Sequence, residues 1–300
     1  MLTSDLPQSG ATTSILAQGE GWRVMKVVCC SGPSDRPFEE QHEWTSVSAV
    51  SEGTFTYRSS RGRALMAPGS LLLGNGGSCY ECGHEHGIGD RCVSFQYSPE
   101  LVEDTVGALK GLRREMFRNV RIPPLELLLP LLNRIRLDTI APDILHAEET
   151  ALELLATAFA IDHDVSGSVS GAGEEKRVAQ AIGIINTRFA EPLSIAYLAQ
   201  TVGMRRRQFA ASFKRVAGVT PYKYILNRRL DAAVDCLRTG NETVLNIALD
   251  TGFGDLSEFT RRFRARFGSP PAAFRAIHGA AGWGRHATAA VRERTESALG

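Results

Sequence analysis

Hydrophobic and polar residues alternate along the first third of the chain in a way that is typical of β-strands. Short apolar segments there are separated by Gly, Pro, Ser and Asp. In segments 54–59 and 92–97, aromatic or branched residues recur at every second position, so each can bury one face and expose the other. The pattern predicts a small barrel or sandwich of strands over residues 22–30, 45–50, 54–59, 70–73 and 92–97.

After Pro99 the hydrophobic period changes to that of helices. Segments 125–137 and 142–161 are rich in Leu, Ala and Glu. A broad apolar stripe on the second helix comprises Ile144, Leu145, Leu152, Leu155 and Phe159. The stripe fits two interpretations, a cover for the β-domain or a subunit interface.

A Gly- and Ser-rich stretch, 164–173, has the composition of a flexible linker. The helices expected beyond it are bounded by N-cap residues, Gly stops and Pro. They cover residues 175–189, 195–201, 205–216, 221–239, 244–251 and 256–267. The tail from Gly279 is expected to be ragged.

Composition is that of an ordinary globular protein, with 300 residues, 43% hydrophobic, and a net charge of +1. The charge is divided unevenly, because residues 1–173 hold 14 Lys+Arg against 22 Asp+Glu and residues 174–300 hold 20 against 11. A basic carboxy-terminal half favours nucleic acid as a partner. Neither a membrane-spanning run nor a secretory signal is recognisable, so no membrane partner and a cytoplasmic location are expected.

Two segments of the basic half repeat one pattern. Ala199 precedes Gly203 by four residues, and Ala248 precedes Gly252 by four. A helix-turn-helix needs a small residue where its helices cross and a Gly that adopts positive φ at the turn. The helix after each Gly carries a Phe-rich stripe, expected to be buried, comprising Phe209, Phe213 and Val216 in the first unit and Phe259, Phe263 and Phe267 in the second.

The opposite faces of these two helices are expected to be exposed and cationic. They carry Arg206, Arg207 and Lys214 in the first unit and Arg261, Arg262 and Arg264 in the second. Cations bind phosphates, and Arg also reads base edges. Two matched units about fifty residues apart favour a protein that enters two major grooves of double-stranded DNA over an inert helical bundle. A binder that ignores DNA sequence is a further alternative.

These features resemble the AraC/XylS family of bacterial transcription regulators over about residues 175–275. The most specific part runs from Ile247 and Ala248 through 252–259, Arg261 to Phe263, and 267–271. The resemblance implies two recognition helices in successive major grooves, and base contacts by Leu256, Ser257, Thr260 and Arg261. The first unit departs from the family pattern, since Arg205 stands at a usual Ser N-cap and alanines stand at positions 210 and 211. Arg205 cannot accept the helix amide hydrogen bonds but adds a cation for phosphate.

The amino-terminal half is more loosely similar to the cupin β-barrel on which many of these regulators bind an effector. The similarity lies in His42, segment 53–58 and segment 68–73. An enzymatic cupin carries a fuller histidine box than the Gln41, His42, Glu43 found here. We therefore expect no enzyme, and a metal-dependent cupin enzyme with a nucleic-acid-tethering tail is the alternative.

A cluster of possible metal ligands follows, comprising Cys79, Cys82, His84, His86 and Cys92. Thiolate and imidazole are ligands that zinc and other thiophilic metals prefer, and Cys-x2-Cys presents two sulfurs to one ion. A redox- or electrophile-sensing thiol pair and a polar loop with incidental thiols are the alternatives.

The sequence thus predicts an α+β multidomain transcription factor. The expected parts are a cupin-like sensor barrel (1–98), a helical dimerisation element (99–163), the linker (164–173), an all-α domain with two helix-turn-helix units (174–278) and the tail (279–300). The expected partners are double-stranded DNA, a second copy of the chain, RNA polymerase and an unidentified small-molecule or metal effector. Activation and repression are not distinguished by the sequence.

Overall fold

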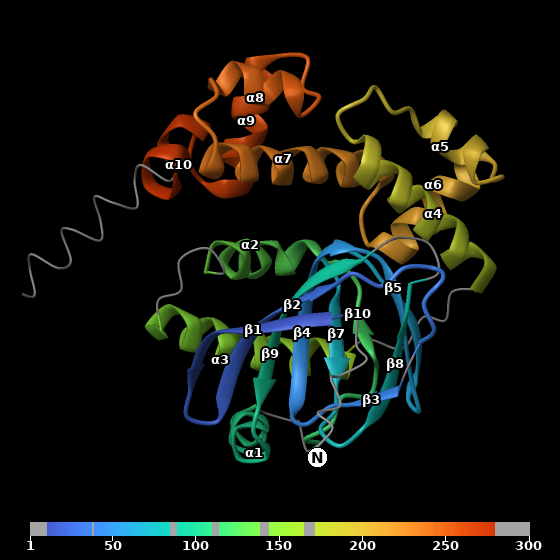
Figure 1. The fold of residues 1–300 in the computed structure, drawn as a ribbon. Coiled ribbons are helices and arrows are strands. Elements are labelled where there is room, and N and C mark those ends of the chain that lie inside the picture. Colours follow the sequence, from blue (N-terminus) through green and yellow to red (C-terminus); the bar gives the residue numbers. More distant parts are fainter. Residues whose placement is uncertain are drawn as a thin grey trace, which may run out of the picture. The chain divides into compact units, whose positions relative to one another are not determined.

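The computed structural model describes residues 11–37, 39–84, 89–109, 114–138, 144–164 and 172–279 (Figure 1). The chain divides into two compact units, one formed by residues 1–183 with 198–221 and the other by 184–197 with 222–300. None of the helices described is both long enough and apolar enough to cross a membrane.

Ten strands of the first unit form two antiparallel sheets. The strands are β1 (Ala11–Gly19), β2 (Trp22–Cys29), β3 (Glu39–Gln41), β4 (Thr45–Gly53), β5 (Phe55–Ser59), β6 (Gly62–Met66), β7 (Leu71–Gly74), β8 (Cys79–Gly83), β9 (Asp90–Tyr97) and β10 (Arg121–Ile122). A six-stranded sheet has the order β1-β2-β9-β4-β7-β10, and a four-stranded sheet has the order β3-β8-β5-β6.

The five strands predicted from alternation are all present, with ends that differ by at most three residues. Five further strands, β1, β3, β6, β8 and β10, were not predicted. Among the described residues the pairings give two separate sheets, so the barrel prediction is corrected to the other alternative, two sheets. The physical reason is that alternation reports one buried face per strand and does not report how sheet edges meet.

Three helices of the first unit share a hydrophobic core with the larger sheet: α1 (Pro99–Ala108), α2 (Leu129–Asp138) and α3 (Ile144–Asp164), with a short 3-10 turn at Glu126–Leu128. Helix α3 packs on β1, β2, β4 and β10. Tyr97 donates to the carbonyl of Ala151 at 2.8 Å, and Phe117 stacks on Phe159 with centroids 4.3 Å apart. Each large apolar side chain buried in this core contributes about 1.5–3 kcal/mol.

The apolar stripe predicted on α3 divides between the two interpretations. Leu155 and Phe159 are buried in the core, which makes this face a cover for the sheet. Ile144 and Leu145 remain 63% and 77% exposed, and Leu152 is 38% exposed. This second face is exposed, in contrast to the face formed by Leu155 and Phe159.

Seven helices follow: α4 (Ala172–Arg188), α5 (Ile195–Thr201), α6 (Arg206–Ala217), α7 (Pro221–Thr239), α8 (Val244–Asp250), α9 (Leu256–Phe267) and α10 (Pro271–His278). Residues 165–171 of the predicted linker lie outside the described residues, and α4 includes its last two residues. The predicted tail lies outside them from residue 280 onward.

Candidate nucleic-acid interface

The first repeated segment forms a helix, a turn and a second helix. Gly203 adopts φ +65°, and the amide of Met204 donates to the carbonyl of Ala199 at 2.9 Å. In α6, Phe209 and Phe213 are fully buried with their rings edge to face at 5.6 Å. The turn Gly and the Phe-rich stripe predicted from sequence are confirmed here.

The second segment repeats this geometry residue for residue. Gly252 adopts φ +87°, and the amide of Phe253 donates to the carbonyl of Ala248 at 2.9 Å. Phe259 and Phe263 of α9 are fully buried. Phe267 is half-buried, and the centres of the Phe263 and Phe267 rings lie 4.6 Å apart. The chain therefore contains two helix-turn-helix units with the same turn.

The two turns differ in what surrounds their glycines. A Cβ at Gly203 would have no atom within 4 Å, whereas a Cβ at Gly252 would lie 2.6 Å from the carbonyl oxygen of Ala190. Gly252 is therefore required by both its positive φ and close packing, and Gly203 by its φ alone.

Both second helices expose cationic faces. Helix α6 belongs to the compact unit formed by residues 1–183 with 198–221, and α9 belongs to the other compact unit. The exposed predicted residues are Arg205, Arg206, Arg207 and Lys214 at α6, and Leu256, Ser257, Arg261 and Arg264 on α9. Thr260 is half-buried.

Arg262 is placed differently from its neighbours. Its Nε donates to Glu258 at 3.1 Å, and its guanidinium lies 5.9 Å from the centre of the Tyr222 ring. Arg262 therefore packs across the surface of its own unit, which the sequence did not indicate. Arg266, which was not predicted as a site residue, forms an ion pair with Asp231 at 2.8 Å and so ties α9 to α7.

The two exposed helices begin differently. The Asp255 carboxylate accepts hydrogen bonds from the amides of Ser257 at 3.1 Å and Glu258 at 2.9 Å. These amides hold the pKa of Asp255 below its usual value. Arg205 occupies the equivalent N-cap with φ −69° and ψ 140°, but its side chain makes no capping hydrogen bond. The expectation that Arg205 does not accept the helix amide hydrogen bonds is confirmed.

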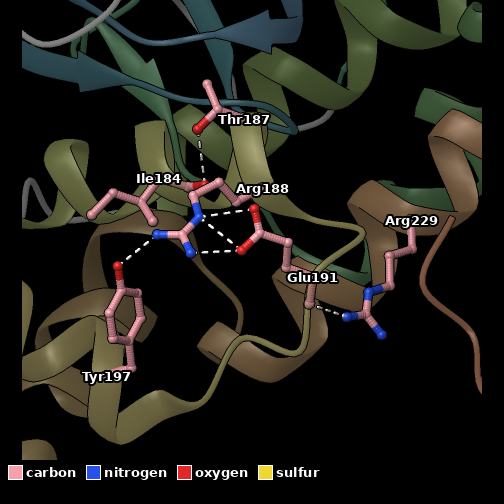
Figure 2. Close-up of polar contacts among 6 residues, drawn as sticks. All are labelled: Ile184, Thr187, Arg188, Glu191, Tyr197 and Arg229. Carbon is pink, nitrogen blue, oxygen red and sulfur yellow. Dashed lines mark hydrogen bonds and ion pairs between the residues drawn. The ribbon is translucent and has the colours of Figure 1, made fainter. Parts of the chain in front are cut away.

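A polar network joins the end of α4 to the second helix-turn-helix unit, and Figure 2 shows its side chains. Arg188 binds Glu191 through Nε and Nη2 and donates to the hydroxyl of Tyr197 at 2.6 Å. Arg229 of α7 donates to three backbone carbonyls, those of Phe189 at 2.7 Å, Glu191 at 2.8 Å and Gly252 at 2.6 Å. The guanidinium of Arg229 thus connects the segment after α4 to the turn between α8 and α9.

The amino-terminal thiols and imidazoles are distributed more widely than their spacing suggested. Cys79 is exposed, His84 and Cys92 are buried, and His86 lies outside the described residues. Among the described residues, one group could hold a metal ion, comprising Cys29, His84 and Asp90. Their ligand atoms all lie within 4.8 Å of one another. Of the five predicted ligands, only His84 belongs to this group.

The sequence did not predict Cys29 and Asp90 as ligands, because they are brought together by strand pairing. Cys29 at the end of β2 lies directly opposite Asp90 at the start of β9. His84 Nε2 lies 2.5 Å from Asp90 Oδ2. Burial opposes the charge of His84, but hydrogen bonds with Asp90 and Cys29 outweigh it and raise the pKa of His84 to about 9.

His42, the predicted cupin-like histidine, lies in an aromatic environment. Its Nε2 is hydrogen-bonded to the Tyr57 hydroxyl at 2.8 Å, and its ring stacks on Tyr80 at 4.2 Å. Burial lowers the pKa of His42 to about 4. The structure therefore places His42 in a half-buried position with both ring nitrogens hydrogen-bonded.

Comparison with known proteins identifies a helix-turn-helix domain over residues 198–277. A putative AraC-like transcription regulator of Streptomyces lividans is 34% identical over 113 residues, which are 38% of this chain and 37% of that protein. The chain thus spans little more than a third of that relative. The XylDLEGF operon transcriptional activator 2 of Pseudomonas putida is 31% identical over 115 residues, 37% of this chain and 71% of that protein.

Among solved structures, a transcriptional regulator of Chromobacterium violaceum, described as having an AraC-type DNA-binding domain, is 31% identical. The match covers 37% of this chain and 98% of that chain, with a TM-score of 0.34.

Proposed function

This chain belongs to the AraC/XylS family of transcription regulators, and on that premise we propose that it binds specific promoter sequences in response to a signal received by its amino-terminal domain. It is a regulator and not an enzyme. The observation that carries the proposal is the repeated turn, in which Met204 and Phe253 make the same hydrogen bond to an Ala five residues earlier. Each turn is followed by a helix that buries Phe and exposes cations.

In this proposal, residues 174–278 form the DNA-binding domain, and α6 and α9 enter successive major grooves. Arg205, Arg206, Arg207 and Lys214 supply cations from α6. On α9, Leu256, Ser257, Thr260 and Arg261 contact bases, and Arg264 contacts phosphate. Arg262 is proposed to contact DNA while its side chain stays packed against Glu258 and Tyr222.

The remaining parts are assigned by the same proposal. Residues 1–98 form a cupin-like sensor domain, and 99–163 a dimerisation element. The exposed face of α3, with Ile144, Leu145 and Leu152, supports a homodimer because an apolar face of this kind is stabilised by a second copy. The proposed location is the cytoplasm, where RNA polymerase and promoter DNA are present.

The test begins with the genomic fragments that the purified full chain retains at physiological salt, identified by sequencing. A shared motif among them is expected, and equal retention of shuffled sequences would instead show a binder indifferent to sequence.

Two variants of α9 then separate base contacts from phosphate contacts. Arg261→Ala is expected to cost about 1–3 kcal/mol of discrimination at one base pair. Arg264→Ala, a control at another exposed residue of the same helix, is expected to weaken binding to specific and random DNA alike and to reduce the salt slope by about 1. Undiminished discrimination by Arg261→Ala in a footprint would refute the role of Arg261.

A further inference from the structure

Three segments of the amino-terminal domain converge at the ends of its two sheets. Cys29 ends β2 and Asp90 begins β9, and these strands are neighbours in the six-stranded sheet. His84 directly follows β8 of the four-stranded sheet. The 2.5 Å contact between His84 and Asp90 therefore joins the two sheets through a pair of side chains.

The three side chains carry one sulfur, one imidazole nitrogen and one carboxylate oxygen. These ligand atoms lie within 4.8 Å of one another. Bond lengths of zinc to S, N and O place the donors of a tetrahedral ion about 3.3–3.6 Å apart. The present spacing therefore reaches coordination distance through small side-chain movements, in which the His84 and Asp90 atoms separate by less than about 1 Å.

The backbone around the cluster is tightly held. Gly89 has φ +71°, its amide donates to the carbonyl of Ser31 at 2.8 Å, and a Cβ on it would lie 2.5 Å from the Cys29 carbonyl oxygen. Gly53, opposite Asp90 on β4, has φ +77°, and a Cβ there would lie 2.2 Å from the Gly89 carbonyl oxygen. Close packing at both glycines fixes Cys29 and Asp90 relative to each other, which is the preorganisation that a ligand site needs.

The three donors are largely shielded from solvent, and their chemistry suits a soft cation. The side chains of His84 and Asp90 are only 3% and 6% exposed, and Cys29 is half-buried. The buried thiol of Cys92 donates to the second Asp90 oxygen at 3.3 Å, which orients the carboxylate. Asp90 already has His84 and Cys92 as the hydrogen-bonding partners that a buried carboxylate needs, so a bound ion would take the place of the proton between His84 and Asp90. The sulfur beside these two groups selects soft metals.

We propose that Cys29, His84 and Asp90 bind a thiophilic divalent cation of the zinc class. Three protein donors leave the fourth position of a tetrahedral ion to water or to an outside ligand. The donors come from both sheets, so the bound ion fixes how the sheet ends meet. The inference rests on the proposed function in one respect, because such an ion would be the signal that the amino-terminal domain receives.

The test uses the metal-free, reduced full chain titrated with Co²⁺ and then with Zn²⁺. One equivalent of Co²⁺ is expected to produce a thiolate-to-cobalt charge-transfer absorption, and Zn²⁺ is expected to abolish it. Cys29→Ser is expected to remove the band, and Asp90→Asn is expected to lower the affinity at least about tenfold. Cys30 is an exposed neighbour of Cys29, and Cys30→Ser is the matched control. This variant is expected to keep the absorption band and the Co²⁺ affinity of the wild type.

Cys79→Ser separates this site from one built on the Cys-x2-Cys pair. An unchanged band in Cys79→Ser supports the Cys29 site. Loss of the band in Cys79→Ser, its persistence in Cys29→Ser, or no Co²⁺ binding by the wild type would each overturn the proposal.

X-ray absorption of the zinc-loaded wild type tests the same site without any substitution, so a variant that fails to fold leaves the question decidable. One sulfur among light-atom ligands is expected, and two or more sulfurs would refute the donor set. DNA retention is measured separately, so failure of metal binding leaves the Arg261 result intact, and the reverse also holds.

Discussion

Replacing Arg205 tests the asymmetry between the two exposed helices. Its backbone already has the extended φ and ψ of an N-cap, yet its side chain makes no capping bond. Asp255 at the equivalent position of α9 accepts two amides. In Arg205→Ser, the hydroxyl is expected to accept the amide of Arg207 or Gln208 and to stabilise α6 by about 1 kcal/mol.

The same substitution removes an exposed cation. If Arg205 neutralises one phosphate, the slope of log K against log salt falls in magnitude by about 0.9. Extrapolated from 1 M salt, this corresponds to about an eightfold weaker affinity at 0.1 M. Arg205→Ala is the matched control, because it loses the cation without gaining a cap.

Amide hydrogen exchange in the first turn of α6 and salt-dependent DNA binding measure the two effects in the full chain. A gain of 1 kcal/mol slows exchange about fivefold in Arg205→Ser relative to Arg205→Ala. Both variants are expected to share the smaller salt slope. Equal exchange rates in the two variants would contradict the capping argument, and an unchanged slope would contradict the phosphate contact.

Three further substitutions probe the fold. Gly203→Ala is expected to lower the free energy of unfolding by about 1 kcal/mol, because alanine is strained at positive φ. Gly252→Ala is expected to cost about 2 kcal/mol more, because its Cβ would also meet the Ala190 carbonyl. Equal losses for the two variants in denaturant melts would refute this difference. His42 has a pKa lowered to about 4, so the unfolded chain binds the additional proton between about pH 6.5 and 4, and up to about 3 kcal/mol of stability is lost as the pH falls through that window. His42→Gln is expected to lack this loss of stability at low pH. If the free energy of unfolding falls equally with pH in His42→Gln and the wild type, the pKa of His42 is not the cause. Asp162→Ala leaves the amides of Arg118 and Asn119 without their acceptor and is expected to cost about 3 kcal/mol, whereas a loss below 1 kcal/mol in the same melts would mean that water replaces the carboxylate.

Local signals predicted much of the carboxy-terminal half. Gly203 and Gly252 could be assigned to turns because an Ala four residues earlier and a Phe-rich stripe afterwards define one helix pair within about twenty residues. The structure gives both positive φ. Helix α1 was missed although Ser98 caps it, accepting the amide of Leu101 at 3.3 Å, and Pro99 is its first residue. A Ser-Pro pair, with Ser as N-cap and Pro at the first helical position, is a start signal for this helix.

Contacts between distant segments were beyond the sequence pattern. Cys29 and Asp90 are 61 positions apart and meet only because β2 pairs with β9 in one register. Strand alternation shows which face a residue occupies but not which strand lies beside it. For the same reason the Cys-x2-Cys spacing drew attention to Cys79, which the structure leaves exposed. Arg262 was assigned by helical position alone, and the Tyr222 ring that holds it comes from another helix.

The three carbonyls that accept hydrogen bonds from Arg229 limit where the chain can be cut to produce the DNA-binding half as a separate fragment. The helix-turn-helix match begins at residue 198, but two of the three acceptors, the carbonyls of Phe189 and Glu191, precede it. A recombinant fragment that starts at residue 198 would leave the planar guanidinium of Arg229 without two of its three acceptors. It would also lack the Ala190 carbonyl that packs against Gly252. A piece that retains these contacts has to start at or before Phe189, directly after the end of α4.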